Sequence, residues 1–214
     1  MRPQLYLLAS GLFNQPIPQR LKTLHDLLVE LLSTVPPKAP WRETLVTLEP
    51  QLNYDEELET EYSRLFILAV PHVPAQPFGS YWLERDQRLL GTTSLEIEEM
   101  MMKYGIVIAK DTGLLSDHIV SELEFMAYLA SLDEESAPQT QQQLLEQHLA
   151  RWTPLFTAAL RAAHPFPYYH LAADFLDQLI TWDQHQLWQM LSSQESQTHP
   201  TLIATSTRET PSHE

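Results

Sequence analysis

Glycine is scarce and unevenly placed in this chain, and this limits the folds it can adopt more than any other feature. Only five glycines occur in 214 residues, and four of them lie between residues 79 and 113. Because glycine marks turns and interrupts helices, the flanks are predicted to form long helices and the middle of the chain to contain the turns. No alternating apolar and polar run bounded by turn residues is present, so strands are not predicted. The sequence predicts an all-α fold, a single-domain helical bundle with a proline-rich aromatic loop in mid-chain.

Apolar residues recur at helical spacing on both sides of this loop. The segment 18–33 places leucines three and four residues apart, which puts them on one helical face. In the segment 54–70, acidic residues precede a similar apolar face and suit the positive end of a helix. Further helices are predicted over residues 93–105, 117–133, 138–163 and 168–191.

The two ends of the chain differ in character. Residues 192–214 contain ten Ser or Thr among 23 positions, so we expect one all-helical domain over residues 1–191 and a flexible Ser/Thr-rich tail over 192–214. The start, "MRPQLYLLASGLF", is interrupted by Gln4 and Tyr6, and we interpret it as a buried helix rather than a signal peptide. No apolar run approaches the roughly 18 residues of a membrane span, so we expect a cytoplasmic protein without stable membrane insertion.

Acidic residues outnumber basic ones by 28 to 13, which gives a formal net charge of −15. Such an excess repels phosphate backbones and argues against nucleic-acid binding. Residues 111–150 carry eight Asp or Glu and no Lys or Arg, and residues 43–61 carry seven acids and no base. Solvated helix faces explain much of this charge, but the two blocks also leave an electronegative surface suited to a cationic peptide.

Signatures of common enzyme classes are missing. The chain contains no phosphate-binding glycine loop, dinucleotide fingerprint or nucleophile elbow, and no cysteine, so we expect no cofactor. One pattern of residues is nevertheless compatible with an enzyme. His118 and Glu122 lie four residues apart on a predicted helix with Asp117 adjacent, and these residue types bind metal ions. A metal-dependent hydrolase using these three side chains is therefore the alternative function.

Asp117 and His118 precede the largely apolar segment 119–129. Ser116 or Asp117 is expected to cap the helix that starts here, because a short polar side chain satisfies free amide groups at a helix N-terminus. His118 is expected to be neutral, since a positive charge is unfavourable at that end. The pair is open to two interpretations: a structural cap or a recognition site.

The stretch "PFGSYWLERD" in the central loop concentrates aromatic side chains. Phe78, Tyr81 and Trp82 flank Gly79 and Ser80. Gly79 permits close backbone approach, and the aromatic rings offer a large apolar area at low entropy cost. They either fill a core between helices or form an interface.

Five short stretches, in this order, resemble the TorD/DmsD/NarJ family of molybdoenzyme maturation chaperones. The run from glycine through serine and tryptophan to an acid is most similar to the DmsD-like branch. The stretches are "EYSRLF" at 61–66, "PFGSYWLERDQRLLG" at 77–91, "SDHIVSELEFMAYL" at 116–129, "HLARW" at 148–152 and "PFPYYHLA" at 165–172.

The resemblance implies an all-helical, non-catalytic chaperone in the cytoplasm, either monomer or dimer. Such a protein binds the twin-arginine leader peptide of a molybdopterin-dependent reductase of the DMSO or TMAO type. It also holds the apo form of that catalytic subunit until the cofactor is inserted. An all-α scaffold subunit that binds a folded partner but no isolated leader is a further alternative. The residues that the resemblance links to leader binding are Asp117, His118, Gly79, Ser80 and Trp82; by proximity we add Phe78, Tyr81, Leu83 and Glu84.

This chain departs from the family pattern just before Asp117. Relatives commonly have Glu-Pro-x-Asp-His, whereas here Leu114 and Leu115 precede Ser116. A carboxylate and a helix-starting proline are lost, and with them one expected contact to the arginines of a leader.

Overall fold

The computed structural model describes residues 1–86, 89–109, 113–132 and 137–198. Within these ranges the chain is helical without strands, apart from an isolated antiparallel bridge between Phe78 and His118. The predicted all-α fold is confirmed. The α-helices are α1 Arg2–Leu12, α2 Pro18–Thr34, α3 Arg42–Leu48, α4 Glu56–Tyr62, α5 Gly79–Leu83, α6 Thr92–Lys103, α7 Ile119–Ser131, α8 Ala137–Leu144, α9 Ala150–Ala162 and α10 Pro167–Thr198.

Local sequence explains several helix ends. Proline lies in the first turn of α1 and α2, where its missing N–H would have no helical partner in any case. At α4, Asp55 accepts a hydrogen bond from the N–H of Leu58 at 2.6 Å and caps the helix. The helix predicted over 138–163 is divided, because a π-helical turn at Leu145–Leu149 lies between α8 and α9.

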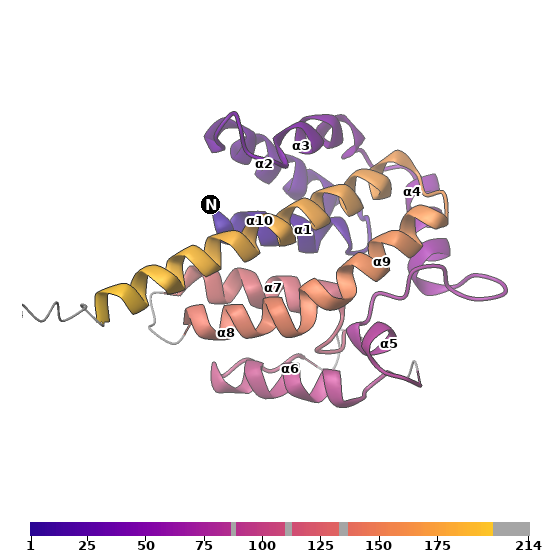
Figure 1. The fold of residues 1–214 in the computed structure, drawn as a ribbon. Coiled ribbons are helices and arrows are strands. Elements are labelled where there is room, and N and C mark those ends of the chain that lie inside the picture. The colour runs from indigo at the N-terminus through magenta and orange to yellow at the C-terminus, as the bar shows by residue number, and fades with distance from the viewer. Residues whose placement is uncertain (87–88, 110–112, 133–136, 199–214) are drawn as a thin grey trace, which may run out of the picture.

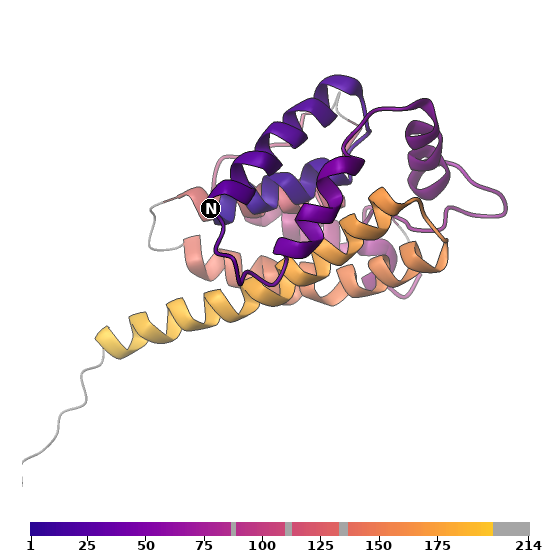
Figure 2. The ribbon, with the colours of Figure 1, turned by 90° about the horizontal axis from the view of Figure 1, so that it is seen from above.

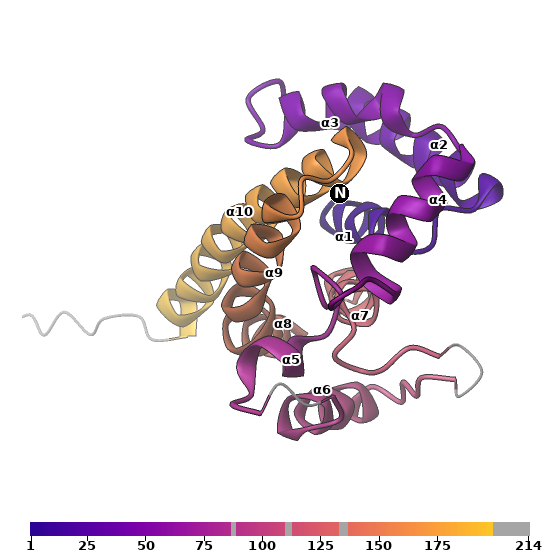
Figure 3. The same cartoon turned by 90° about the vertical axis from the view of Figure 1, so that its right-hand side faces the viewer.

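The core is built around α1, as expected from the apolar start of the chain. Leu5, Tyr6, Leu8 and Leu12 are fully buried, and α1 packs along α7. Figure 3 shows α7 end-on, between α1 on one side and α6 on the other, with α8 and α9 beside it. Because α7 is surrounded in this way, most of its side chains are buried, including polar ones.

A buried ion pair fastens α1 to α10. Arg2 donates to both carboxylate oxygens of Asp183 at 2.6 and 2.8 Å, and the Tyr6 hydroxyl donates to the same carboxylate at 2.8 Å. Burial and the Asp183 carboxylate raise the pKa of Tyr6 well above its ordinary value. The phenol therefore remains a donor, and the Asp183 charge is fully paired.

Helix α10 is longer than the sequence pattern predicts. It continues to Thr198, whereas we expected it to end near Leu191. Its C-terminal part extends beyond the other helices in two views (Figures 1 and 2). The remainder of the predicted flexible tail, residues 199–214, lies outside the described residues, so the division of the chain at residue 191 stays a prediction.

The central aromatic segment is only partly a loop. Its proline-rich portion, residues 71–77, is irregular, but Gly79–Leu83 forms the short helix α5. Helix α6 follows and lies at the edge of the bundle (Figures 1 and 3).

Two of the five family-like stretches meet at the α9–α10 connection. The Arg64 side chain pairs with the buried Glu61 carboxylate at 2.6 and 2.8 Å and donates to the carbonyl of Ala163 at 3.2 Å. Glu61 also accepts the N–H of Phe166 at 3.1 Å. "EYSRLF" therefore holds the start of "PFPYYHLA" in place, which is a structural role.

Candidate functional site

The Asp117–His118 segment is bound directly to the start of α5. The N–H of Gly79 donates to the Asp117 carbonyl at 2.8 Å, and the N–H of Ile119 donates to the Pro77 carbonyl at 2.8 Å. The N–H of Ser80 donates to Oδ2 of Asp117 at 2.9 Å. Two stretches that lie almost forty residues apart in the sequence thus form one unit.

Asp117 is fully buried at the centre of this unit, with 0% of its surface exposed. Its carboxylate accepts a hydrogen bond from a backbone N–H at the start of α5, where the N–H groups have no partner within the helix. A hydrogen bond to a charged acceptor contributes about 1.5–3 kcal/mol. Asp117 therefore orders α5 and does not lie on the surface.

The expected helix cap at Ser116 or Asp117 is wrong. The N-cap of α7 is His118, whose Nδ1 accepts the N–H of Val120 at 3.1 Å. Ser116 instead donates through Oγ to the carbonyl of Ser94 at 2.7 Å. Because the Asp117 carboxylate is hydrogen-bonded to α5, the neighbouring His118 caps α7.

His118 is neutral, as predicted, but the main cause differs from the one we expected. Burial lowers its pKa to about 4, and the nearby Asp117 only partly opposes this. An unprotonated Nδ1 is also what the cap requires, because a protonated nitrogen cannot accept. The ring packs edge-on against Phe78, with centroids 5.1 Å apart.

Gly79 lies in a closely packed position behind α5. A Cβ at this position would lie 3.1 Å from Oε1 of Glu122 and 3.2 Å from Nε1 of Trp152. These two side chains are hydrogen-bonded, since the Trp152 indole donates to Glu122 at 3.1 Å. Three of the family-like stretches therefore converge here, from α5, α7 and α9.

The interior behind Gly79 is polar. Burial, with a contribution from Asp117, raises the pKa of Glu122 well above its ordinary value, which favours the protonated form of this carboxyl. Burial and the nearby Arg151 lower the pKa of His148 to about 4. Among the described residues, Asp117 Oδ1, Glu122 Oε2 and both His148 ring nitrogens have no hydrogen-bond partner. Neutral Glu122 and His148 reduce the cost of burying these groups beside a carboxylate.

The proposed metal site finds no support. Over the described residues, no group of three His, Asp or Glu side chains is arranged to hold a metal ion. Two of the candidate ligand atoms are also engaged in hydrogen bonds, because His118 Nδ1 accepts from Val120 and Glu122 Oε1 accepts from Trp152. The hydrolase alternative is accordingly dropped.

The aromatic side chains of α5 lie between core and surface. Tyr81 and Trp82 are half-buried and pack edge-on against each other with centroids 5.1 Å apart. Trp82 donates through Nε1 to the carbonyl of Gln76 at 2.8 Å and packs on the core. Leu83 is half-buried as well. Each of these side chains fills space and also presents an exposed portion.

Glu84 connects α5 to α6. Its carboxylate accepts the N–H of Thr93 at 2.9 Å. A Cβ at Gly91 would collide with the same carboxylate. Glu84 therefore positions the first turn of α6.

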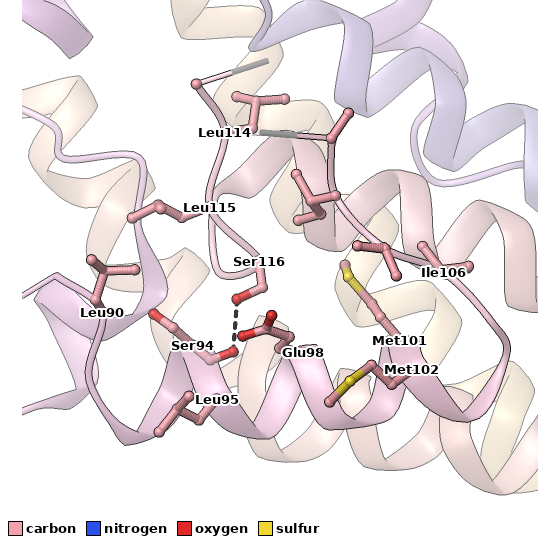
Figure 4. A pocket seen from close by; sticks show the side chains of 14 residues that line it. Leu90, Ser94, Leu95, Glu98, Met101, Met102, Ile106, Leu114, Leu115 and Ser116 are labelled. Carbon is pink, nitrogen blue, oxygen red and sulfur yellow. Dashed lines mark hydrogen bonds between the residues drawn. The ribbon is translucent and has the colours of Figure 1, made fainter. Parts of the chain in front are cut away.

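A cavity of about 430 Å³ lies along α6, beside Ser116. Its described lining is mainly aliphatic side chains and methionine, and it includes none of the residues predicted to bind peptide. Figure 4 shows Leu90, Leu95 and Leu115 at one end, Met101, Met102 and Ile106 at the other, and Glu98 between them. This cavity is therefore separate from the predicted site, which stays a prediction. The sequence signal that points to the cavity is a helix with apolar residues on two faces, since Ile97 and Met101 are buried whereas Leu95 and Met102 are exposed.

A family model described as nitrate reductase delta subunit matches residues 15–158. The chain is 33% identical over 114 residues to a Salmonella typhi protein named Tat proofreading chaperone DmsD, covering 52% of this chain and 54% of that protein. It is 29% identical over 128 residues to a Vibrio atlanticus protein named chaperone protein TorD, covering 56% and 59%. The chain thus spans just over half the length of these relatives.

A solved structure is similar over most of the chain. It is described as a candidate redox enzyme maturation protein from Archaeoglobus fulgidus, with 27% sequence identity, a TM-score of 0.59, and coverage of 84% of this chain and 93% of that one. Among the described residues, no helix has the length and apolar character needed to cross a bilayer.

Proposed function

This chain belongs to the nitrate reductase delta subunit family, and on that premise we propose that it is a cytoplasmic chaperone without catalytic activity. Its ligand is the twin-arginine leader peptide of a molybdopterin-dependent reductase, and it holds the apo catalytic subunit during maturation. The names of the Salmonella and Vibrio relatives support this assignment.

One observation carries the proposal at the level of the site. Hydrogen bonds from Gly79, Ser80 and Ile119 join the two stretches that the family resemblance links to leader binding. Such a unit presents a fixed surface, and a pre-ordered surface loses less entropy on binding.

The residues of the proposed site have two different roles. Phe78, Tyr81, Trp82 and Leu83 are half-buried and provide apolar contact area for the peptide. The other residues are positioning residues, which keep α5, α6 and the start of α7 in register. They are Gly79, Ser80, Glu84, Asp117 and His118.

The net charge of −15 supports a cationic ligand. Glu96, Glu98 and Glu99 are exposed on α6, the helix that follows α5 and contacts it. Charge complementarity raises the association rate and selects the partner, whereas apolar burial provides most of the affinity.

The test is titration calorimetry of the full chain with a synthetic twin-arginine leader. We expect saturable binding to the leader and weaker binding to the same peptide with both arginines replaced by glutamine. No binding to the leader would overturn the proposal. If the chain instead bound only the folded apo subunit, it would be a scaffold subunit.

A further inference from the structure

A second surface, distinct from α5, remains without a role. Two cavities of about 430 and 270 Å³ share the segment 106–109, Met101 and Leu114 in their lining. The first runs along α6 and the second reaches Tyr128 on α7. We call the two together the methionine furrow.

The furrow exposes an unusual amount of apolar surface. Leu95 and Met102, seven residues apart on α6, are 58% and 54% exposed, and both line the larger cavity. Leu90 and Val107, at 68% and 80% exposure, border the same cavity. Apolar residues grouped in a groove on a folded protein mark an interaction surface.

The charge and shape of the furrow define the partner. Among the described residues that line it, the charged ones are Glu98 and Glu124, so an apolar segment with a cationic flank is complementary. Methionine side chains are flexible and polarizable, and such surfaces bind apolar segments of varied sequence. A furrow of this kind accepts different apolar sequences and excludes acidic flanks.

The length of the furrow further limits which peptide segments fit it. Helix α6 has 12 residues, and at about 1.5 Å per residue it is about 18 Å long. The apolar region of an export leader has roughly 7–15 residues, and as a helix it would span about 10–22 Å. The furrow and this region therefore match in length.

We propose that the methionine furrow binds the apolar stretch that follows the arginine pair of the leader. This inference rests on the proposed leader binding and adds the place on the protein where the apolar stretch of the leader binds. The α5 surface and the furrow are then successive parts of one binding path, joined where Glu84, next to α5, accepts the N–H of Thr93 at the start of α6.

The first experiment compares two double variants of the full chain by titration calorimetry. Leu95→Gln with Met102→Gln makes the furrow polar and keeps good helix formers on α6. The control is Val29→Gln with Val46→Gln, which changes two apolar residues of similar exposure, 47% and 51%, on α2 and α3. We expect the furrow variant to bind the leader about tenfold more weakly, because it loses apolar burial, and the control variant to bind like the wild type.

The second experiment needs no substitution. Methyl-labelled methionine NMR reports all six methionines of the chain, and addition of leader is expected to shift Met101 and Met102 while leaving the buried Met126 unchanged. Wild-type leader affinity in the furrow variant, or shifts confined to other methionines, would overturn the furrow assignment and leave the proposed function intact. Loss of a dimer in the furrow variant with unchanged leader affinity would also overturn it. If the wild type bound no leader at all, both proposals would fail.

Discussion

The carboxylate of Asp117 accepts the backbone N–H of Ser80 at 2.9 Å in the interior of the protein. An acidic residue just before the start of a helix suggests a direct contact with an arginine of the leader peptide. Because Asp117 is buried, its role is instead to hold α5 against the start of α7.

Asp117→Ala is expected to destabilise the protein by about 1–3 kcal/mol, because a buried amide loses its acceptor. It should also weaken leader binding. Asp117→Asn retains a carbonyl oxygen that can accept from Ser80, so it should keep most of the leader affinity. Urea unfolding and titration calorimetry measure the two effects. If Asn weakened binding as much as Ala, the negative charge itself would be contacting the leader.

Gly79→Ala is expected to cost about 1–3 kcal/mol through overpacking against Glu122 and Trp152. The indole N–H resonance of Trp152 should shift, because its hydrogen bond to Glu122 must adjust. Gly105→Ala is the control: no atom lies within 4 Å of its Cβ, but its φ of +70° makes any side chain strained. The control should lose stability without moving the Trp152 resonance, and a Gly79→Ala variant as stable as the wild type would refute the packing argument.

Glu122→Gln tests the protonated carboxyl. The folded-state pKa of Glu122 is raised, so the folded protein binds more protons than the unfolded one. The resulting contribution to the free energy of unfolding is fully present below the pKa of Glu122 in the unfolded state. It is lost as the pH rises through the pKa of Glu122 in the folded state. Glutamine does not titrate and still accepts from Trp152. The variant should therefore gain stability relative to the wild type as pH rises from 5 to 8, by at most about 1.4 kcal/mol per pH unit. A difference that stays constant with pH would show that Glu122 does not titrate in this way.

His118→Asn tests the neutral cap. Burial lowers the pKa of His118 from 6.5 to about 4, so its contribution to stability is present above the unfolded pKa and is lost as pH falls through the folded one. The lost contribution is roughly 3 kcal/mol between those limits. Asparagine caps helices well and does not titrate in this range, so the variant should lose less stability than the wild type between pH 6.5 and 4. His185→Asn, at an exposed position, is the matched control and should follow the wild type. If the free energy of unfolding changed with pH in the same way in all three proteins, the lowered pKa of His118 would be contradicted.

The sequence alone was sufficient for the fold class, because helix formation depends on local spacing and on where glycine and proline interrupt it. It located the stretches around Gly79 and Asp117, and it predicted a neutral His118. It also identified the segment "MRPQLYLLASGLF" as a buried helix, which is α1 in the structure.

Other features depend on how the helices pack. Asp117 could cap α7 in isolation, but in the folded protein α5 takes up its carboxylate and His118 becomes the cap. Likewise, a leucine or methionine on α6 has the same local preference whether it is buried or exposed. Only the position of α6 at the edge of the bundle leaves Leu95 and Met102 in solvent and creates a furrow beside them. Local sequence determines where a helix forms, whereas burial, hydrogen-bond partners and cavities are properties of segments brought together from distant parts of the chain.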